Sequence, residues 1–170
     1  MAETPPPENT AAGPELESVE APEIGIEAQY IKDLSFESPL GPDAQAAIEQ
    51  NPSVAVEVST SARPLGPSRY EVALVIRGEA KGGDKSVFII ELTYGATITL
   101  SNVPEDAVAP ILLIEGARLI FPFARNVVAE VTRDGGFPPL FINPIDFVQL
   151  YRDQHMNEAD GNGAANGGKV

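Results

Sequence analysis

The sequence predicts an α+β fold: a four-stranded antiparallel sheet with one long kinked helix and a short C-terminal helix on one face. Four stretches between Ile26 and Leu100 alternate apolar and polar side chains, as half-buried strands do. A long apolar segment with helical start and stop signals follows them. Because the strands come first and the helices after, the elements should form segregated layers and not alternating βαβ units.

The strands are separated by proline and glycine. Two prolines within Ser38–Pro42 end the first strand, which begins at Ile26. A short helical turn capped by Asp43 is expected before the second strand, which begins at Val54. The remaining boundaries are a loop at Arg63–Pro67, a third strand at Tyr70–Ala80, a hairpin turn at Lys81–Asp84 and a fourth strand from Ser86, with a bulge at Gly95.

The long helix is predicted between Val103 and Gly136. Pro104 and two acids favour its start, and two glycines favour its end. Between Glu105 and Arg133, 17 of 29 residues are apolar and surround most of the helix, which indicates burial on two sides. One side can pack on the chain's own sheet and the other on a second copy. The expected oligomer-interface residues are Leu113, Ile120 and Val127; Pro122 should kink the helix, and Glu115, Arg118 and Arg125 argue against a membrane span.

After the helix, Phe137–Pro144 reads as an apolar, proline-rich loop and Ile145–Tyr151 as a short helix. The Glu- and Pro-rich segment 1–24 and the Gly- and Asn-rich segment 153–170 are expected to be disordered tails. They leave one domain at 25–152.

Composition restricts the function. A net charge of -14 argues against nucleic acid and favours a basic protein partner. No signal peptide is evident, so the cytoplasm is the expected compartment. The chain has no Cys, and its one His, His155, lies in the predicted tail. We therefore expect no catalytic residue, no metal site and no cofactor.

The side chains predicted to point away from the helices are mostly acidic. They are Glu27, Asp33, Glu37, Glu57, Glu71, Glu79 and Glu91, against one base, Arg77, with the apolar Ile31, Val75, Val87 and Ile89 among them. One interpretation is an ordinary solvated sheet face. The other is a docking surface for a basic partner, since an apolar patch rimmed by one sign of charge suits such a partner.

Four motifs resemble the SecB family of bacterial protein-export chaperones. They stand in family order at Ile31–Glu37 (IKDLSFE), Phe88–Glu91 (FIIE), Leu119–Arg125 (LIFPFAR) and Gly136–Leu140 (GFPPL). The resemblance covers about 30–151. It implies a cytosolic homotetramer, a dimer of dimers, that holds unfolded preproteins without catalysis and delivers them to the SecA translocation ATPase. It also implies no direct membrane insertion.

The same resemblance implies two sets of site residues. SecA is expected to dock on Asp33, Glu37, Ile89 and Glu91, which the alternation had placed on the open face. The groove for unfolded chains is expected to include Phe88, Phe121, Phe137 and Leu140, although plain core packing explains these residues equally well. The sequence departs from the family between Ala44 and Val54, which contains no aromatic residue.

Two other functions remain open at this stage. One is a scaffold or antitoxin-associated regulator of the same fold that binds one dedicated partner. The other is a small-molecule carrier, which would need an enclosed apolar pocket.

Overall fold

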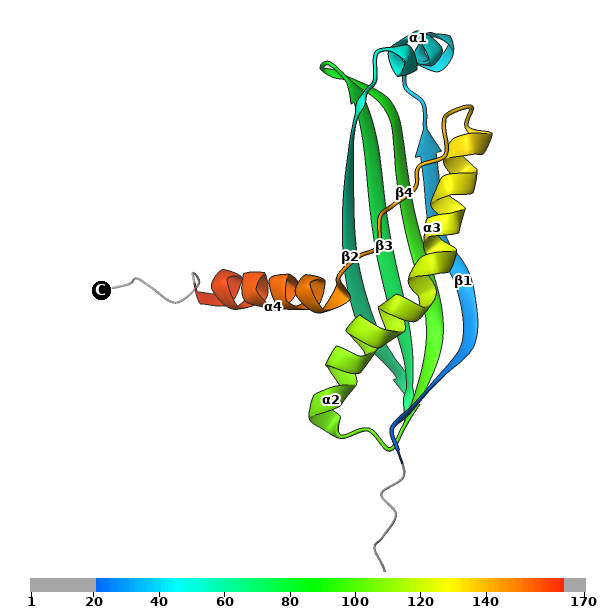
Figure 1. Cartoon of the computed structure of the whole chain (residues 1–170). Coiled ribbons are helices and arrows are strands. Elements are labelled where there is room, and N and C mark those ends of the chain that lie inside the picture. The colour runs from blue at the N-terminus through cyan, green and yellow to red at the C-terminus, as the bar shows by residue number, and fades with distance from the viewer. Residues whose placement is uncertain (1–20, 164–170) are drawn as a thin grey trace, which may run out of the picture.

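A four-stranded antiparallel sheet forms the body of the protein, with helices on one face, as predicted (Figure 1). The computed structural model describes residues 21–163. The strand order is β1-β4-β3-β2, so β1 and β2 are the edges. The strands span Glu23–Glu37 (β1), Ser53–Gly66 (β2), Arg69–Gly82 (β3) and Lys85–Ser101 (β4).

The connection between β2 and β3 differs from the predicted loop. β2 continues through Arg63 and Pro64 to Gly66, so the loop expected at Arg63–Pro67 is wrong. Pro64 is tolerated because β2 is an edge strand with no further neighbour to bond. The turn between β2 and β3 lies at residues 67–68, and Ser68 has a φ of 54°. The turn predicted between β3 and β4 is confirmed, with Gly83 at a φ of 62°.

The bulge predicted at Gly95 is wrong, and the pairing of β1 with β4 has two register shifts instead. β4 pairs with β3 without interruption at Gly95, whereas the pairing of β1 shifts between Ile26 and Ala28 and again between Ile31 and Asp33. The shifts move Tyr30 to the open face, opposite Gly95, and Ile31 to the helix side, opposite Tyr94. Gly95 makes room for the Tyr30 ring, because a Cβ there would lie 2.7 Å from its Cε2 atom.

The long helix begins and ends where predicted but is irregular at a different point. It comprises α2 (Glu105–Pro110), a wider π-helical turn, η2 (Ile111–Gly116), and α3 (Ala117–Asp134). The π turn follows Pro110, and the Ala117 N–H bonds to the Leu112 carbonyl, five residues back. Pro122 lies within α3, which continues through it.

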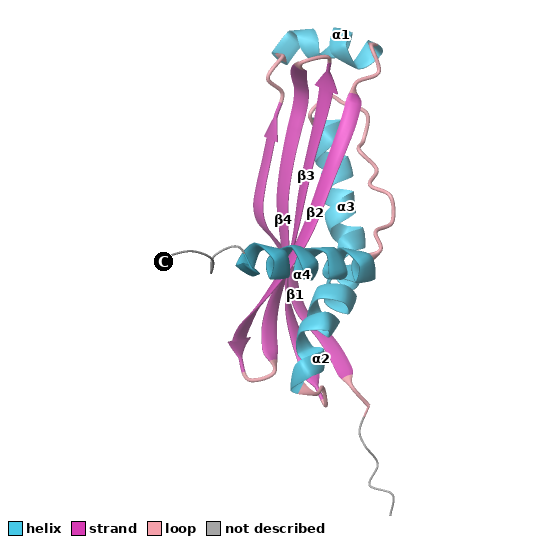
Figure 2. Cartoon of the chain, turned by 90° about the vertical axis from the view of Figure 1, so that its left-hand side faces the viewer, coloured by secondary structure: helices cyan, strands magenta, loops and turns pink. Residues whose placement is uncertain are grey.

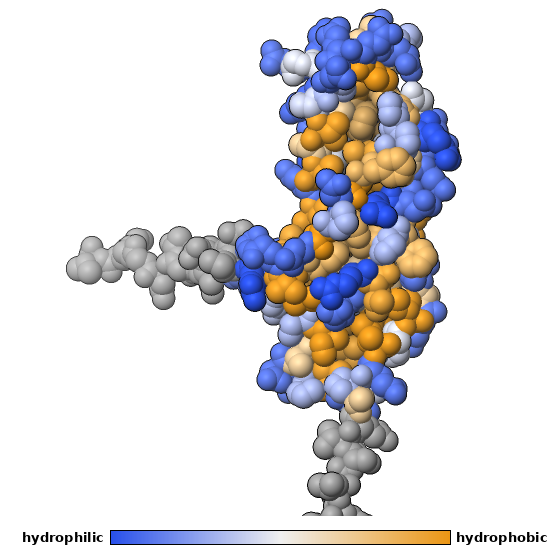
Figure 3. Space-filling view, in the orientation of Figure 1, coloured by the Kyte–Doolittle hydropathy of each residue, from blue (hydrophilic) through white to orange (hydrophobic). Residues whose placement is uncertain are grey.

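The long helix packs one side against β3 and β4 and leaves the other free. The α3 residues Ile120, Ala124 and Val128 are fully buried and belong to the same core as the sheet residues Leu74, Ile76, Leu92 and Ile98. On its outer side, Leu119 and Phe123 are exposed. By length and hydropathy alone Glu105–Asp134 could cross a membrane, but the inner side of this helix packs on the sheet. Figure 3 shows apolar side chains gathered over this face of the molecule.

Two shorter helical regions complete the fold. The 3₁₀ turn η1 (Gly41–Asp43) and α1 (Ala44–Glu49) join β1 to β2, and Asp43 makes no side-chain cap. Helix α4 (Phe147–Gly163) begins beside β2 and extends away from the sheet (Figure 1). Viewed from that side, it lies across the direction of the strands (Figure 2). It extends well beyond the predicted Ile145–Tyr151 and into the segment expected to be disordered. The other parts of the predicted tails, 1–20 and 164–170, lie outside the described residues.

Asp146 explains where α4 begins. Its Oδ1 accepts hydrogen bonds from the Val148 N–H at 3.0 Å and the Gln149 N–H at 3.1 Å, so it caps the helix. About two turns further along, the Thr60 hydroxyl of β2 donates to Gln154 Oε1 at 3.0 Å and fixes α4 against the edge strand.

Candidate functional site

An apolar hollow of about 280 Å³ lies at the end of the sheet near α1. Its lining comes from α1 and the turn after it, the starts of β2 and β4, and the loop after α3. The residues are Ile48, Asn51, Pro52, Val54, Val87, Phe88, Phe137, Pro138, Pro139 and Leu140. The structure thus brings together Phe88, Phe137 and Leu140, three of the four residues expected in the groove.

Aromatic rings form the floor of this hollow. Phe36, Phe88 and Phe137 pack together, with ring centroids 5.0 to 5.9 Å apart. Phe88 and Phe137 are each only 6% exposed and belong to the hydrophobic core. Both interpretations of Phe88 and Phe137, core packing and groove lining, therefore agree with the structure, because the two side chains pack in the core and also border the hollow.

A second hollow, of about 440 Å³, continues along the edge strand. It lies between the three valines of β2 and the loop that crosses beside them, and its residues are Val54, Val56, Val58 and Leu140 to Ile145. Val54 and Leu140 border both hollows, so together they make one surface groove, which we call the β2 groove. Because the groove lies along the surface and is not enclosed, it does not suit a small-molecule carrier.

Phe121 does not belong to the β2 groove. It is 6% exposed and packs edge-on against Phe147, with ring centroids 5.6 Å apart, under the start of α4. Conversely, Val54, Val56 and Phe141 border the groove but were not predicted as groove residues from the sequence. The alternating valines were recognised as a strand, but no sequence signal showed that the helices leave this edge uncovered. Phe141 is 73% exposed, and its only signal was its place in an apolar loop.

The four residues expected to contact SecA share the open face of the sheet. In the pairing of β1 with β4, Glu37 lies opposite Ile89 and Asp33 opposite Thr93, while Glu91 is opposite Ser35. Together with Glu57, Val75 and Arg77, Asp33 and Glu91 border a shallow hollow of about 440 Å³. Arg77 lies between Glu57, its cross-strand partner, and Glu91, whose Oε1 is 3.4 Å from the Arg77 Nε.

Two of the apolar residues expected among these acids lie elsewhere. Ile31 is on the helix side because of the β1 irregularity described above. Val87 is fully buried, at a shift in the pairing of β3 with β4 that follows Ala80. Val75 and Ile89 remain on the open face, so the patch contains less apolar surface than the simple alternation predicts.

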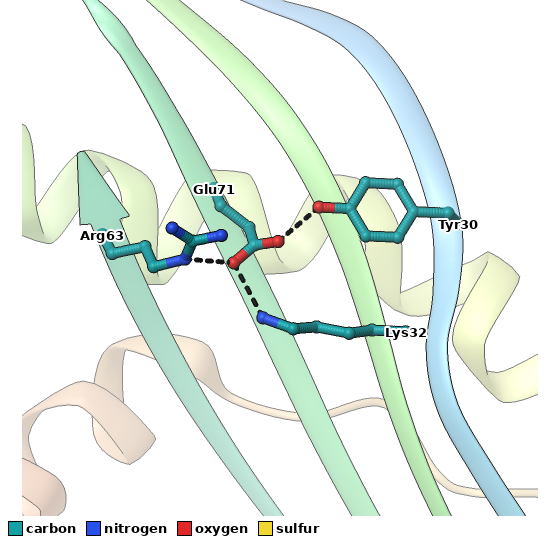
Figure 4. Close-up of polar contacts among 4 residues, drawn as sticks. All are labelled: Tyr30, Lys32, Arg63 and Glu71. Carbon is teal, nitrogen blue, oxygen red and sulfur yellow. Dashed lines mark hydrogen bonds and ion pairs between the residues drawn. The ribbon is translucent and has the colours of Figure 1, made fainter. Parts of the chain in front are cut away.

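Glu71 is the exception among the open-face acids because it is buried. Its carboxylate accepts hydrogen bonds from the Tyr30 hydroxyl at 2.5 Å, Lys32 Nζ at 2.9 Å and Arg63 Nε at 2.5 Å (Figure 4). Donation by Arg63, then by Lys32 and Tyr30, lowers the pKa of Glu71 from 4.5 to about 2. The same contact with Glu71 raises the pKa of Tyr30. Glu71 therefore stays ionised and links β1, β2 and β3.

The residues expected to join copies of the chain occupy different environments. Leu113 and Val127 are half-buried, whereas Ile120 is fully buried in its own chain and has no surface to offer a second copy. The exposed apolar residues of α3 are Leu119 and Phe123, at 43% and 52% exposure. Among the described residues, no three His, Cys, Asp or Glu side chains are grouped to hold a metal ion.

The chain is similar to known proteins over most of its length. The family model "Preprotein translocase subunit SecB" matches residues 17–158. The protein-export protein SecB of Bradyrhizobium sp. strain BTAi1 is 45% identical over 152 residues, which cover 89% of this chain and 94% of that protein. The protein-export protein SecB of Azorhizobium caulinodans is 47% identical over 139 residues, or 82% and 87% of the two chains.

A solved structure supports the fold. The SecB-like chaperone Rv1957 of Mycobacterium tuberculosis, in complex with a ChAD peptide from the HigA1 antitoxin Rv1956, superposes with a TM-score of 0.59. The sequences are 13% identical, and the match covers 72% of this chain and 90% of that one.

A four-stranded antiparallel sheet with a long helix and a shorter C-terminal helix defines the fold as α+β and SecB-like. The chain belongs to the SecB family, and its role is that of a chaperone in protein export.

Proposed function

We propose that this protein holds unfolded preproteins in the β2 groove, in the cytoplasm, and delivers them to the SecA translocation ATPase. The observation that carries the proposal is the groove itself, an apolar surface along an uncovered edge strand. Apolar burial gives affinity without a strict sequence motif, which suits a chaperone that binds many different chains. The relatives named as protein-export proteins support the same role.

SecA docks, in this proposal, on Asp33, Glu37, Ile89 and Glu91. A surface of one sign of charge steers and orients a partner of the opposite sign. The valines of the β2 groove lie on the helix side of the sheet, because Val58 pairs with the buried Ile76, whereas Glu57 and the SecA residues lie on the other side. SecA and an unfolded chain can therefore bind at the same time.

The assembly proposed is a homotetramer built as a dimer of dimers. Leu119 and Phe123 offer apolar surface on the outer side of α3, and an exposed apolar row follows the edge strand β1: Ile24, Ile26, Ile31 and Leu34. Several grooves in one assembly would hold one long unfolded chain more tightly than any single groove, because the second contact forms within the complex.

Refolding kinetics test this function. A precursor diluted from denaturant should refold more slowly in the presence of the protein, with or without ATP, and excess SecA should release it. Unchanged refolding at a large excess of the protein would contradict the proposal.

A dedicated partner is the second candidate function. The structure of Rv1957, a protein of the same fold, contains an antitoxin peptide, so this fold can also bind one particular segment. A panel of unrelated unfolded chains separates the two functions. An export chaperone should bind most of the panel, whereas a dedicated scaffold should bind one partner and ignore the others.

A further inference from the structure

The wall of the β2 groove is held by one residue of the long helix, Thr132. The wall segment Phe137–Leu140 borders the first hollow. The Phe137 N–H donates to the Thr132 main-chain carbonyl at 3.1 Å. The Leu140 N–H donates to the Thr132 side-chain Oγ1 at 2.9 Å. Thr132 thus receives a hydrogen bond from each end of the wall.

The segment has no other backbone donor. Residues 138 and 139 are both proline, which carries no N–H. Beyond Phe137, the first N–H that can attach the wall to the helix is therefore that of Leu140. The Leu140 side chain packs on Gly78 of β3, where an added Cβ would lie 3.1 Å from Leu140 Cδ2.

The Thr132 hydroxyl is itself fixed. It is fully buried, and its Oγ1 lies 2.9 Å from the Val128 carbonyl and 3.1 Å from the Ala129 carbonyl in the preceding turn. A hydroxyl has one hydrogen to donate and lone pairs that accept. It donates back into α3, which aims a lone pair at Leu140. No exposed side chain takes part in this contact.

We propose that Thr132 is a positioning residue for the binding of unfolded chains. It touches no bound chain; it fixes Leu140, which borders both hollows, at the distance from β2 that keeps the groove open. Loss of the hydroxyl frees the Leu140 N–H, so the wall samples other positions and the groove is formed for a smaller fraction of the time. Apparent affinity falls by that fraction. This inference rests on the proposed function of the β2 groove.

The test uses the full-length protein and reduced, carboxymethylated α-lactalbumin, a chain that stays unfolded in buffer. Thr132→Val removes the hydroxyl at nearly constant volume, and Thr132→Ser keeps it. Thr60→Val is the matched control, since it also removes a buried hydroxyl but breaks a contact with α4 and not with the wall. For each variant we would measure the dissociation constant and the hydrogen exchange of the Leu140 amide.

We expect Thr132→Val to bind about tenfold more weakly, with fast exchange at Leu140 and unchanged exchange in β3. Thr132→Ser and Thr60→Val should bind within about twofold of the wild type, because their walls stay attached. A general loss of structure would speed exchange in β3 as well, so the local pattern separates positioning from stability.

Two results would overturn the inference. One is a Thr132→Val variant with fast Leu140 exchange and unchanged affinity. The other needs no variant: a wild-type Leu140 amide that exchanges as fast as an unprotected loop amide, which would show that the wall is not held. If the wild type itself fails to bind the unfolded chain, the proposed function is wrong, whatever the Leu140 amide does.

Discussion

Glu71 shows how a single side chain determines which residues the open face presents. Two of its three partners lie at the second irregularity of β1, where Lys32 is the extra residue without a partner on β4 and Tyr30 is two residues before it. Without that extra residue the strict alternation of a strand would carry Asp33 to the opposite face from Tyr30. The contacts with Glu71 thus stabilise the local backbone that keeps Asp33 on the acidic side.

Glu71 also predicts a pH dependence of stability. Its folded pKa, about 2, lies below the ordinary 4.5, so its contribution is complete above about pH 4.5 and is lost as the pH falls toward 2. We expect Glu71→Gln to lower the free energy of unfolding by about 2 kcal/mol at pH 7 and to flatten its decline in that window. Denaturant unfolding at several pH values measures both. Glu57→Gln, at an exposed carboxylate on the same face, should change little.

The acidic face predicts a selective loss of one partner. Asp33→Lys and Glu91→Lys should each weaken SecA binding at least tenfold or so, because a like charge then faces the basic partner, while binding of an unfolded chain stays unchanged. Glu49→Lys, the same charge change on exposed α1, is the control. If binding of unfolded chains fell as much as binding of SecA, the two surfaces would not be separate.

At the scale of the elements, local sequence signals predicted the features that depend on residues close together in the sequence, such as helix ends and the alternation within a strand. Pro104 and the glycine pair delimited the long helix, and the alternation in β3 and β4 gave the helix-facing side correctly except at Val87, which is buried at a shift in the pairing. The second irregularity of β1 could not be predicted from the sequence, because its contacts are with Glu71, 41 and 39 residues away from Tyr30 and Lys32. For the same reason Phe121 was misplaced: only the tertiary fold brings Phe147 over it.

The edge strand β2 carries a prediction about the groove. Val56→Asp places a charge among the valines that border it, so affinity for an unfolded chain should fall about tenfold or more. Ser59→Asp adds the same charge to the same strand on the open face and should leave that affinity unchanged. Titration of a labelled unfolded chain into each variant measures the difference. Equal losses would place the binding surface elsewhere.

The outer side of α3 carries a prediction about assembly. Phe123 is half exposed in the single chain, so Phe123→Asp should leave the subunit folded. At an interface, however, an unpaired charge costs several kcal/mol, about enough to split the assembly. Sedimentation should show a smaller species with unchanged circular dichroism. The control Gln50→Glu adds the same charge at an exposed residue just after α1. A Phe123→Asp variant of undiminished mass would exclude this face as an interface.

At the scale of the whole molecule, one thin sheet separates two kinds of surface. The helix side contains the apolar residues that hold the fold together and border the β2 groove, and the open side contains the acidic residues. Because the two sides are carried by alternate residues of the same strands, a chain can be held on one side while a partner docks on the other. This separation explains how holding and handover can be independent.

The most direct test of the central claim is light scattering on the purified protein, alone and after mixing with an unfolded precursor in the absence of ATP. We predict a mass close to four chains for the protein alone, and a stable, heavier complex in the mixture. A single-chain mass that the precursor does not change would contradict both the assembly and the holding of unfolded chains.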